Sequence, residues 1–310
     1  MKRNVIWNFD DLLNVARSLP AKTIAVIYPR SEETYNSIRD ASKSLKAKFI
    51  LYCDESSSSG AAGLVNKEEI QAEIVIVHDA VEAVTKAVEK AGSNRYDILM
   101  KGDVDTGTMM RVVLQESSSL RTGKLLSDIF VLEYQSRTDN KFVMITDGGM
   151  TLAPDLKNKV ELIDNAVEVA HALGNELPKV AILSATEFVL PNLQSTLDAA
   201  ALSKMNERGQ IKGCVVDGPL ALDNALSPEA AAEKSINSAV AGRAEILVAA
   251  NIESANSLAK STTYFAGLRL AHVIVGARLP ILIPSRSDKS DAKLLSIALG
   301  IVMSEHFQFH

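Results

Sequence analysis

The sequence predicts an α/β fold built on mainly parallel sheets flanked by helices, and three observations support this prediction. Short apolar runs bounded by turn residues alternate with segments of helical periodicity, which is typical of α/β proteins. Several of these runs are almost continuously apolar, as strands buried on both faces of a parallel sheet must be. With 310 residues, 47% of them apolar, the chain can bury a substantial core and has room for two domains of roughly 100–200 residues each.

The pattern begins with a predicted strand over 23–27 and a largely polar predicted helix over 32–45. Further strands are expected over residues 49–52, 74–77, 98–101, 129–133, 143–146, 180–183, 213–216, 245–248, 273–275 and 281–283. The Ser- and Gly-rich segment 55–63 is expected to be a surface loop, because Ser and Gly favour neither a core nor a regular element.

Charge and hydropathy argue against nucleic-acid and membrane partners. The chain carries 33 Lys and Arg against 38 Asp and Glu, a net charge of −5, and has no long basic run. The apolar stretch 271–284 is interrupted by Arg278 and is shorter than the about 20 residues that a membrane helix needs. Two aspartates at 10–11 interrupt the start of the chain before the apolar core of a signal peptide develops. We therefore expect a cytoplasmic protein with small-molecule partners.

The sequence lacks the usual motifs of several cofactor and nucleophile chemistries. It contains no GxGxxG and no GxSxG, and Gly123-Lys124 lacks the remaining residues of a P-loop. Cys53 and Cys214 lie far apart, and neither they nor the five histidines have the spacing of a metal site. Neither a disulfide framework nor a bound metal is indicated.

Polar residues with useful chemistry recur where predicted strands end. They are Lys101-Gly102, Asp147-Gly148-Gly149, Ser184, Asp217-Gly218-Pro219, Asn251 and Ser285-Arg286. In open α/β sheets, ligands bind outside the carboxyl ends of the strands. Gly, Asp and Pro also form ordinary turns, so each position alone has a structural explanation. Their repetition favours a ligand site.

The segment 281–293 is the most informative of these strand ends. Arg286 offers a planar fork of donors to a phosphate, and the helix that follows offers free N–H groups. Asp288 or Asp291 could accept a proton. Alternatively, Ser285 and Asp288 could simply cap the helix, and the sequence leaves both explanations open.

Two other segments carry candidate ligand contacts. Asn256 and Lys260 are four residues apart and therefore lie on one helical face, where both could reach one phosphate or form an exposed polar surface. In the segment 101–106, Gly102 follows Lys101, and a glycine there would let a ligand approach the backbone.

Taken together, these segments resemble the phosphate acetyl/butyryltransferase family. The matching segments, in the family's order, are LMKGDVDT at 99–106, ITDGGMTLAPDL at 145–156, LDAAALSKM at 197–205, VDGPLALDNAL at 216–226, AGRAEILV at 241–248, IESANSLAKS at 252–261 and VGARLPILIPSRSDKSDAKLLSIALG at 275–300. The likeness covers about two thirds of the chain. The APDL segment at 153–156 favours the butyryl branch of the family over the acetyl branch.

The resemblance implies two α/β domains of the isocitrate/isopropylmalate-dehydrogenase-like type, with the active site in the cleft between them. The first domain is expected over residues 1–147 and 284–310, and the second, expected to dimerise, over 148–283. The implied reaction converts acyl-CoA and inorganic phosphate reversibly into acyl phosphate and coenzyme A. Coenzyme A is then a substrate, no cofactor is permanently bound, and the protein is a homodimer.

The resemblance also implies roles for individual residues. In the direction of acyl-CoA formation, the thiolate of coenzyme A attacks the acyl phosphate within a ternary complex, because the thiolate is the reactive form. Asp291 is the expected base, Arg286 the clamp on developing charge, and Ser285 a hydrogen-bond donor. The expected substrate contacts are Lys101, Gly102, Thr106, Ser127, Asn256 and Lys260. This chemistry requires no metal.

Three departures from the family pattern leave alternatives open. Ala255 stands where the family usually has Gly, and its methyl group would crowd an approaching phosphate. Asp128 stands where many butyryltransferases have His, and the acetyl branch places its base carboxylate one position later than Asp291. A non-catalytic acyl-CoA- or phosphate-binding paralogue therefore remains an alternative, as does a dehydrogenase of the same fold type.

Overall fold

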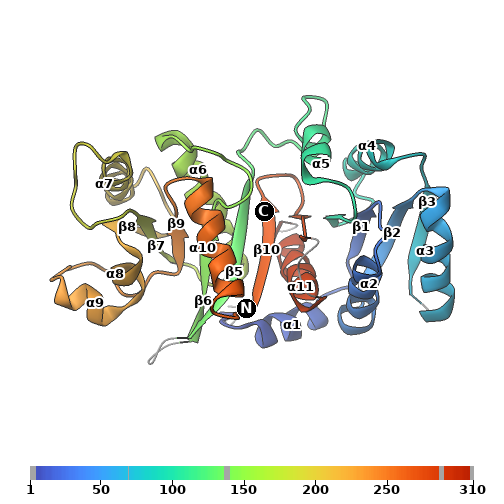
Figure 1. Cartoon of the computed structure of the whole chain (residues 1–310), viewed down its shortest axis with the longest axis horizontal. Helices are drawn as coiled ribbons and strands as arrows, with labels where there is room; N and C mark the ends of the chain where they lie inside the picture. Colours follow the sequence, from blue (N-terminus) through green and yellow to red (C-terminus); the bar gives the residue numbers. More distant parts are fainter. Residues whose placement is uncertain (1–4, 69, 136–139, 286–289, 308–310) are drawn as a thin grey trace. The chain divides into compact units, whose positions relative to one another are not determined.

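The computed structural model describes residues 5–68, 70–135, 140–285 and 290–307. The chain forms two compact units (Figure 1). Unit 1 consists of Met1–Asn8 and Leu125–Leu270, and unit 2 of Phe9–Lys124 and Ala271–His310. No helix of the described ranges is long and apolar enough to cross a membrane.

Unit 2 is a doubly wound α/β unit. Its strands, in sheet order, are β3 (Ala72–Ile76), β2 (Lys48–Cys53), β1 (Thr23–Ile27), β4 (Ile98–Lys101), β11 (Ile281–Leu282) and β10 (Leu270–Val275). The pairs are parallel except for β10 with β11. Its helices are α1 (Phe9–Ser18), α2 (Glu32–Leu45), α3 (Glu55–Glu68), α4 (Ala80–Ala91), α5 (Thr106–Val113) and α11 (Ser290–Phe307). Because β1 to β3 progress in one direction and β4 lies on the other side of β1, right-handed crossovers place α2 and α3 on the face opposite α4.

Unit 1 combines an antiparallel hairpin with parallel strands. Its strands, in sheet order, are β5 (Ser127–Gln135), β6 (Asn140–Thr146), β9 (Ile246–Val248), β7 (Lys179–Leu183) and β8 (Val215–Leu220). Only β5 and β6 are antiparallel among these pairs. Its helices are α6 (Leu156–Ala172), α7 (Gln194–Glu207), α8 (Leu222–Leu226), α9 (Pro228–Glu233) and α10 (Ile252–Tyr264). Phe130, Ile145, Leu247 and the inward face of α10 contribute to one hydrophobic core.

The sequence-based α/β prediction and its strands are confirmed. A strand is present at each predicted run, and the predicted helix over 32–45 is α2. The compact units change at 8/9, 124/125 and 270/271, whereas the predicted domain boundaries lie at 147/148 and 283/284. The difference arises because β5 pairs with β6 and β6 pairs with β9, so these strands group with the middle of the chain.

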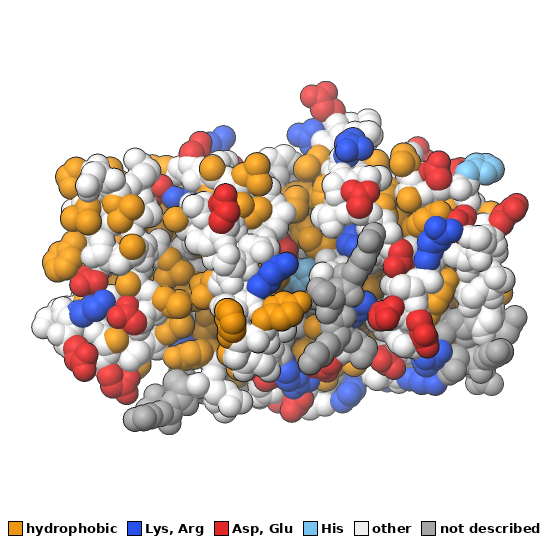
Figure 2. Space-filling view, viewed as in Figure 1, with side chains coloured by type: hydrophobic (Ala, Val, Ile, Leu, Met, Phe, Trp, Pro, Cys, Tyr) orange, Lys and Arg blue, Asp and Glu red, His pale blue; other side chains and the backbone are white. Residues whose placement is uncertain are grey.

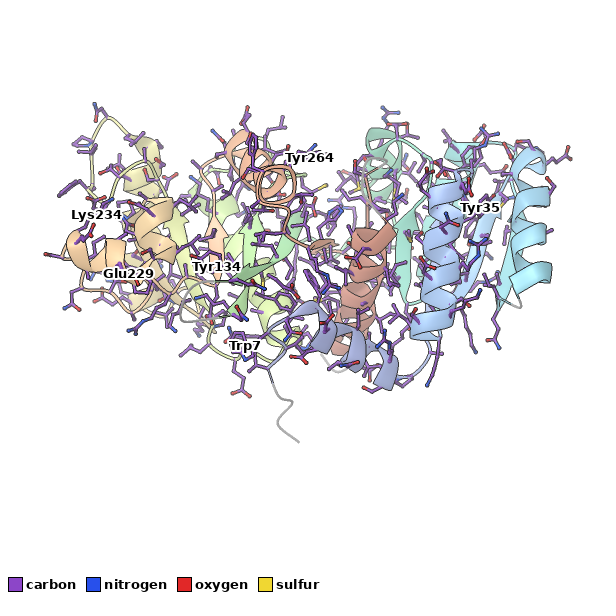
Figure 3. All side chains as sticks on the ribbon, turned by 60° about the horizontal axis from the view of Figure 1, so that its bottom comes forward. Trp7, Tyr35, Tyr134, Glu229, Lys234 and Tyr264 are labelled. Atoms are coloured by element: carbon purple, nitrogen blue, oxygen red, sulfur yellow. The ribbon has the colours of Figure 1, made fainter. Side chains whose placement is uncertain are left out.

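The predicted surface loop over 55–63 is wrong, because this segment forms most of α3. Asp54 begins the helix by accepting a hydrogen bond from the Ser57 backbone N–H at 2.8 Å. Tyr35 of α2 lies against α3 (Figure 3) and donates to the Ser57 carbonyl at 3.1 Å. A side chain at Gly60 would lie 3.5 Å from the Tyr35 ring. The cap and the Tyr35 contact stabilise this segment as a helix, and composition reveals neither of them.

Candidate active site

The first group of predicted site residues lies at one edge of the unit 2 sheet. The parallel strands β1, β4 and β11 are neighbours, with Ile27 opposite Lys101 and Leu282 opposite Met100. The carboxyl ends of parallel neighbours meet at the same edge of a sheet. Lys101 and the chain that leaves β11 toward Ser285 therefore share an edge.

Lys101 and Gly102 are both fixed by local packing. Lys101 is 5% exposed, and its Nζ donates to the carbonyl oxygens of Gly102 and Val104 at 3.3 Å each. The Gly102 N–H donates to the Ile27 carbonyl at 2.9 Å, and a Cβ at this position would lie 2.5 Å from that oxygen. Close approach of the chain leaving β1 is therefore enough to require glycine here, apart from any ligand.

The remaining predicted residues of unit 2 lie at helix starts. Thr106 is the half-buried first residue of α5, which Asp105 caps by accepting from the Thr108 N–H at 2.8 Å. Ser285 is exposed after β11, and Asp291 is exposed in the first turn of α11. The predicted clamp Arg286 and the alternative base Asp288 lie in 286–289, outside the described residues.

A cluster of hydrogen-bonded side chains around Asp54, at the ends of β1 and β2, was not predicted from the sequence. The Asp54 carboxylate accepts hydrogen bonds from the Tyr28 hydroxyl at 2.7 Å, from the Arg30 guanidinium at 2.8 Å and from the Ser57 hydroxyl at 2.7 Å. The hydrogen bonds from Ser57 and then Tyr28 hold the pKa of Asp54 well below its usual range. The Arg30 guanidinium also lies 4.9 Å from the centre of the Tyr28 ring, within cation–π distance. The signal was present in the sequence, since these residues directly follow predicted strands.

The second group of predicted residues lies at one edge of unit 1. β5 runs antiparallel to β6, and β9 runs parallel to β6, so the start of β5 meets the ends of β6 and β9. Ser127 begins β5 and is fully buried. Its hydroxyl accepts a hydrogen bond from the Asn165 amide at 2.8 Å. Asn165 was not predicted, and nothing in the local sequence links it to a residue 38 positions earlier.

Asp147, at the end of β6, organises the loop that follows it. Its Oδ1 accepts from the backbone N–H groups of Asp128 at 3.0 Å and of Gly149 and Met150 at 3.1 Å, and its Oδ2 accepts from Thr151 at 2.7 Å. Asp147 is 3% exposed. Burial raises its pKa in spite of these donors, and the neighbouring Asp128 carboxylate adds to the rise.

Asn256 joins helix α10 to this loop. Its amide Nδ2 donates to the Gly148 carbonyl at 2.8 Å. Lys260 lies one turn further along α10 and is exposed. The structure thus brings Asn256 to the Asp147 loop, and Lys260 follows on the same helix.

Ala255, one of the departures from the family pattern, lies in the hydrophobic core of unit 1. It is fully buried and belongs to the same cluster as Phe130 and Leu247. Its methyl group therefore fills core space and does not stand exposed at the start of α10.

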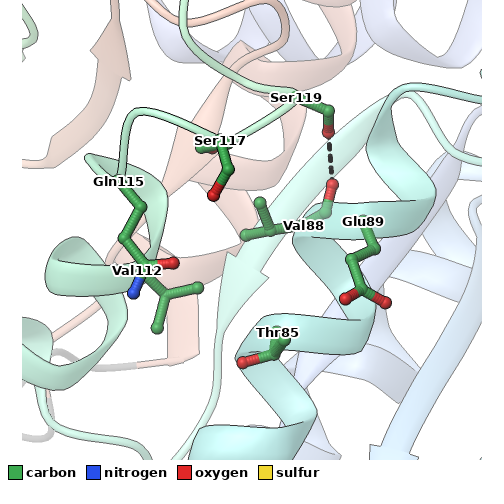
Figure 4. A pocket seen from close by; sticks show the side chains of 8 residues that line it. Thr85, Val88, Glu89, Val112, Gln115, Ser117 and Ser119 are labelled. Atoms are coloured by element: carbon green, nitrogen blue, oxygen red, sulfur yellow. Dashed lines mark hydrogen bonds between the residues drawn. The ribbon is translucent and has the colours of Figure 1, made fainter.

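Two surface pockets lie elsewhere in unit 2. One, of about 270 Å³, lies between α4 and the chain after α5 (Figure 4) and is lined by Thr85, Val88, Glu89, Val112, Gln115 and residues 117–119. The other, of about 500 Å³, includes Tyr96, Asp97 and Arg278. Among the predicted site residues that the structure describes, none lines either pocket. Within the described ranges, no group of three or more His, Cys, Asp and Glu side chains could hold a metal ion.

The chain is similar to known acyltransferases over nearly its whole length. Residues 54–301 match the model of a family described as phosphate acetyl/butaryl transferase. A phosphate butyryltransferase of Clostridium beijerinckii is 41% identical over 297 residues, which are 96% of this chain and 98% of that protein. A phosphate acetyltransferase of Thermotoga maritima is 45% identical over 223 residues, 72% of this chain and 75% of that protein.

The fold is also found among solved structures. The crystal structure of a branched-chain phosphotransacylase from Enterococcus faecalis matches with a TM-score of 0.80 at 28% identity, covering 92% of this chain and 99% of that chain.

Proposed function

The chain belongs to the phosphate acetyl/butaryl transferase family, and on this basis we propose that it transfers a short-chain acyl group reversibly between coenzyme A and inorganic phosphate. The observation that carries the proposal is its near full-length similarity to a phosphate butyryltransferase. The protein is thus an acyltransferase, with acyl-CoA and phosphate as substrates in one direction and acyl phosphate and coenzyme A in the other.

The proposed chemistry is direct transfer within a ternary complex. In the direction of acyl-CoA formation, Asp291 takes the proton of the coenzyme A thiol, whose unperturbed pKa is about 8.5. The thiolate attacks the carbonyl carbon of the acyl phosphate, and the carbon–oxygen bond to phosphate breaks. Arg286 and Ser285 stabilise the charge that develops on the carbonyl oxygen and on the departing phosphate.

The state of the two cysteines supports a mechanism without a covalent enzyme intermediate. Burial raises the pKa of the Cys53 thiol to about 11 and that of Cys214 to about 12. Because the thiolate is the nucleophile, both cysteines are poor acceptors of an acyl group near neutral pH.

Substrate contacts are proposed from both units. Lys101, Gly102 and Thr106 belong to unit 2, and Ser127, Asn256 and Lys260 to unit 1. The Ser127 hydroxyl accepts a hydrogen bond from Asn165, and its own O–H can still donate. An isocitrate-dehydrogenase-like arrangement of two domains around a substrate cleft is part of the same proposal.

A homodimer in the cytoplasm is proposed as well. Unit 1 exposes large apolar side chains after two strands, with Phe188 66% and Val189 52% exposed after β7 and Leu222 41% exposed after β8. Figure 2 shows hydrophobic side chains gathered over this part of unit 1. Apolar patches of this kind mark surfaces where another protein binds, which supports contact with a second copy of the chain.

The function is tested by measuring phosphate-dependent release of coenzyme A by the purified protein. Acetyl-, propionyl-, butyryl- and isobutyryl-CoA are compared, and a reaction without phosphate is the control. We expect turnover, with a larger kcat/KM for butyryl-CoA than for acetyl-CoA, because residues 153–156 resemble the butyryl branch. An equal or larger value for acetyl-CoA contradicts the acyl preference. Failure to release coenzyme A from any of the four contradicts the function itself and favours a binding protein.

A further inference from the structure

We propose that Asp147 is a positioning residue that holds Asn256 in its substrate-binding orientation through the backbone of residues 148–151. This inference rests on the proposed function, in which Asn256 contacts a substrate. Asp147 itself is buried and contacts no substrate in this proposal. It acts on the reaction only through the loop and through Asn256.

The Asp147 carboxylate accepts an unusual number of hydrogen bonds from the backbone. Asp147 accepts four backbone N–H groups, three from the loop that follows it and one from Asp128 at the start of β5. Aspartate side chains commonly accept hydrogen bonds from the backbone that follows them, and here one carboxylate accepts three such bonds, so the loop favours the conformation that brings these N–H groups to it. Asp147 thereby fixes residues 149–151 relative to β5.

The same loop also packs closely against side chains of β5. A Cβ at Gly148 would lie 2.6 Å from the Phe130 ring, and a Cβ at Gly149 would lie 2.6 Å from the Asp128 carboxylate. Real Cβ atoms do not approach this closely, since protein interiors are packed as densely as crystals. The loop thus lies in close contact with Phe130 and Asp128 of β5.

A hydrogen bond connects this loop to Asn256 of α10. The Gly148 carbonyl, one residue after Asp147, accepts a hydrogen bond from Asn256 Nδ2 at 2.8 Å. A carbonyl oxygen can only accept, so this bond identifies Nδ2 of the Asn256 amide and restricts the rotation of the side chain. The Oδ1 and the second N–H of Asn256 are thereby held to a narrower range of directions. If the Gly148 carbonyl moves, the amide loses this orientation.

A double-mutant cycle tests the coupling. Asp147→Asn replaces one acceptor oxygen by a donor that opposes an incoming N–H, and Asn256→Ala removes the amide. Each single variant and the double variant are assayed with butyryl-CoA and phosphate, and kcat and KM are measured separately for both substrates. We expect each single change to lower kcat/KM. The double variant should be only slightly worse than Asn256→Ala alone, with a departure from additivity of about 2- to 150-fold.

A matched control uses another capping aspartate, one outside the proposed site. Asp79 is exposed and accepts from the Glu82 N–H at 2.8 Å at the start of α4. Asp79→Asn should lower the melting temperature slightly and leave kcat/KM unchanged. Its effect should be additive with that of Asn256→Ala. If Asp147→Asn behaves like Asp79→Asn, or if its effect is additive with that of Asn256→Ala, the positioning role is refuted.

A second variant covers the case in which Asp147→Asn does not fold. Gly149→Ala moves the same loop by contact with Asp128 and leaves Asp147 in place. It too should show kinetic coupling to Asn256→Ala, and additivity overturns the inference. An inactive wild-type protein would instead refute the proposed function, so the two failures are distinct.

Discussion

Asp54 in unit 2 and Asp147 in unit 1 both follow a parallel strand and both accept several hydrogen bonds, yet their pKa values move in opposite directions. The pKa of Asp54 is lowered, mainly by the hydroxyl groups of Ser57 and Tyr28. The pKa of Asp147 is raised, mainly by burial, although four backbone N–H groups point at it. Asp54 is half-buried, whereas Asp147 is buried.

The comparison teaches that hydrogen-bond number alone does not decide what a strand-end carboxylate can do. Desolvation penalises the charged form, and hydrogen bonds to the carboxylate favour it. Where the carboxylate keeps contact with water, the hydrogen bonds outweigh the cost of desolvation, the pKa is lowered, and the group is a stable anion. Where it is buried, the donors only reduce the penalty, and the carboxylate serves to organise the backbone. Exposed Asp291, rather than buried Asp147, therefore suits the exchange of a proton with a substrate.

The largest effect on turnover is expected for Asp291→Asn, because exposed Asp291 is the proposed base and buried Asp147 is not. As sole general base, Asp291 should contribute about 10²–10⁴-fold to turnover in the thiol-consuming direction. The measurement is steady-state kcat with acyl phosphate and coenzyme A. Asp288→Asn is the control and should matter less. If Asp288→Asn is the more damaging change while both variants remain folded, the two roles are exchanged.

The next largest effect on turnover is expected for Arg286, which is proposed to stabilise the charge that develops during the reaction. Arg286→Ala should lower kcat by about 10²–10³-fold, the usual cost of losing one stabilising donor in an active site. Arg286→Lys should also lose most activity, because Lys keeps the charge and loses the planar fork. Both melting temperatures should stay near the wild-type value. Wild-type turnover in both variants would remove Arg286 from the site.

A smaller effect is expected on stability, whose dependence on pH should differ between Asp54 and Asp147. The pKa of Asp54 is lowered on folding, so its stabilising contribution is present above its unfolded pKa of about 3.9 and is lost as the pH falls through the folded value. The melting temperature of Asp54→Asn should therefore lie below that of wild type at pH 7, and the gap should shrink toward pH 3.

The contribution of Asp147 to stability should change with pH in the opposite direction, because the pKa of Asp147 is raised on folding. Between the unfolded and folded pKa values the native state binds more protons, so this group's contribution to stability falls as the pH rises through that window. Thermal melts of wild type and both Asn variants from pH 3 to 7 check the two signs. A gap for Asp54→Asn that widens on acidification would break the comparison.

The smallest effect is expected for Ala255→Gly. Loss of a buried methyl and a glycine within α10 should cost about 1 kcal/mol of stability, because Ala255 packs in the core. The KM for phosphate should not change. A severalfold fall in that KM would show that the methyl group obstructs the substrate after all, as the sequence suggested.

The strands and the strand-end positions were predictable because they depend on local pattern. A buried parallel strand must be apolar over several consecutive residues, and that run is visible without any partner. The same reasoning located Lys101, Asp147, Asn251 and Ser285 after strands. It failed for α3, whose Ser- and Gly-rich start is helical because Asp54 caps it and Tyr35 packs against it.

The sequence by itself determined the fold class, the position of each strand and the family, since all three are carried by residues close together along the chain. Only the tertiary structure decided what the individual polar residues do. The Ser127 hydroxyl accepts a hydrogen bond from Asn165, and Asn256 donates to the Gly148 carbonyl across 108 positions of sequence. Burial and hydrogen-bond partners of this kind arise between residues far apart in sequence, and they set whether a side chain carries charge, supports a loop or fills the core.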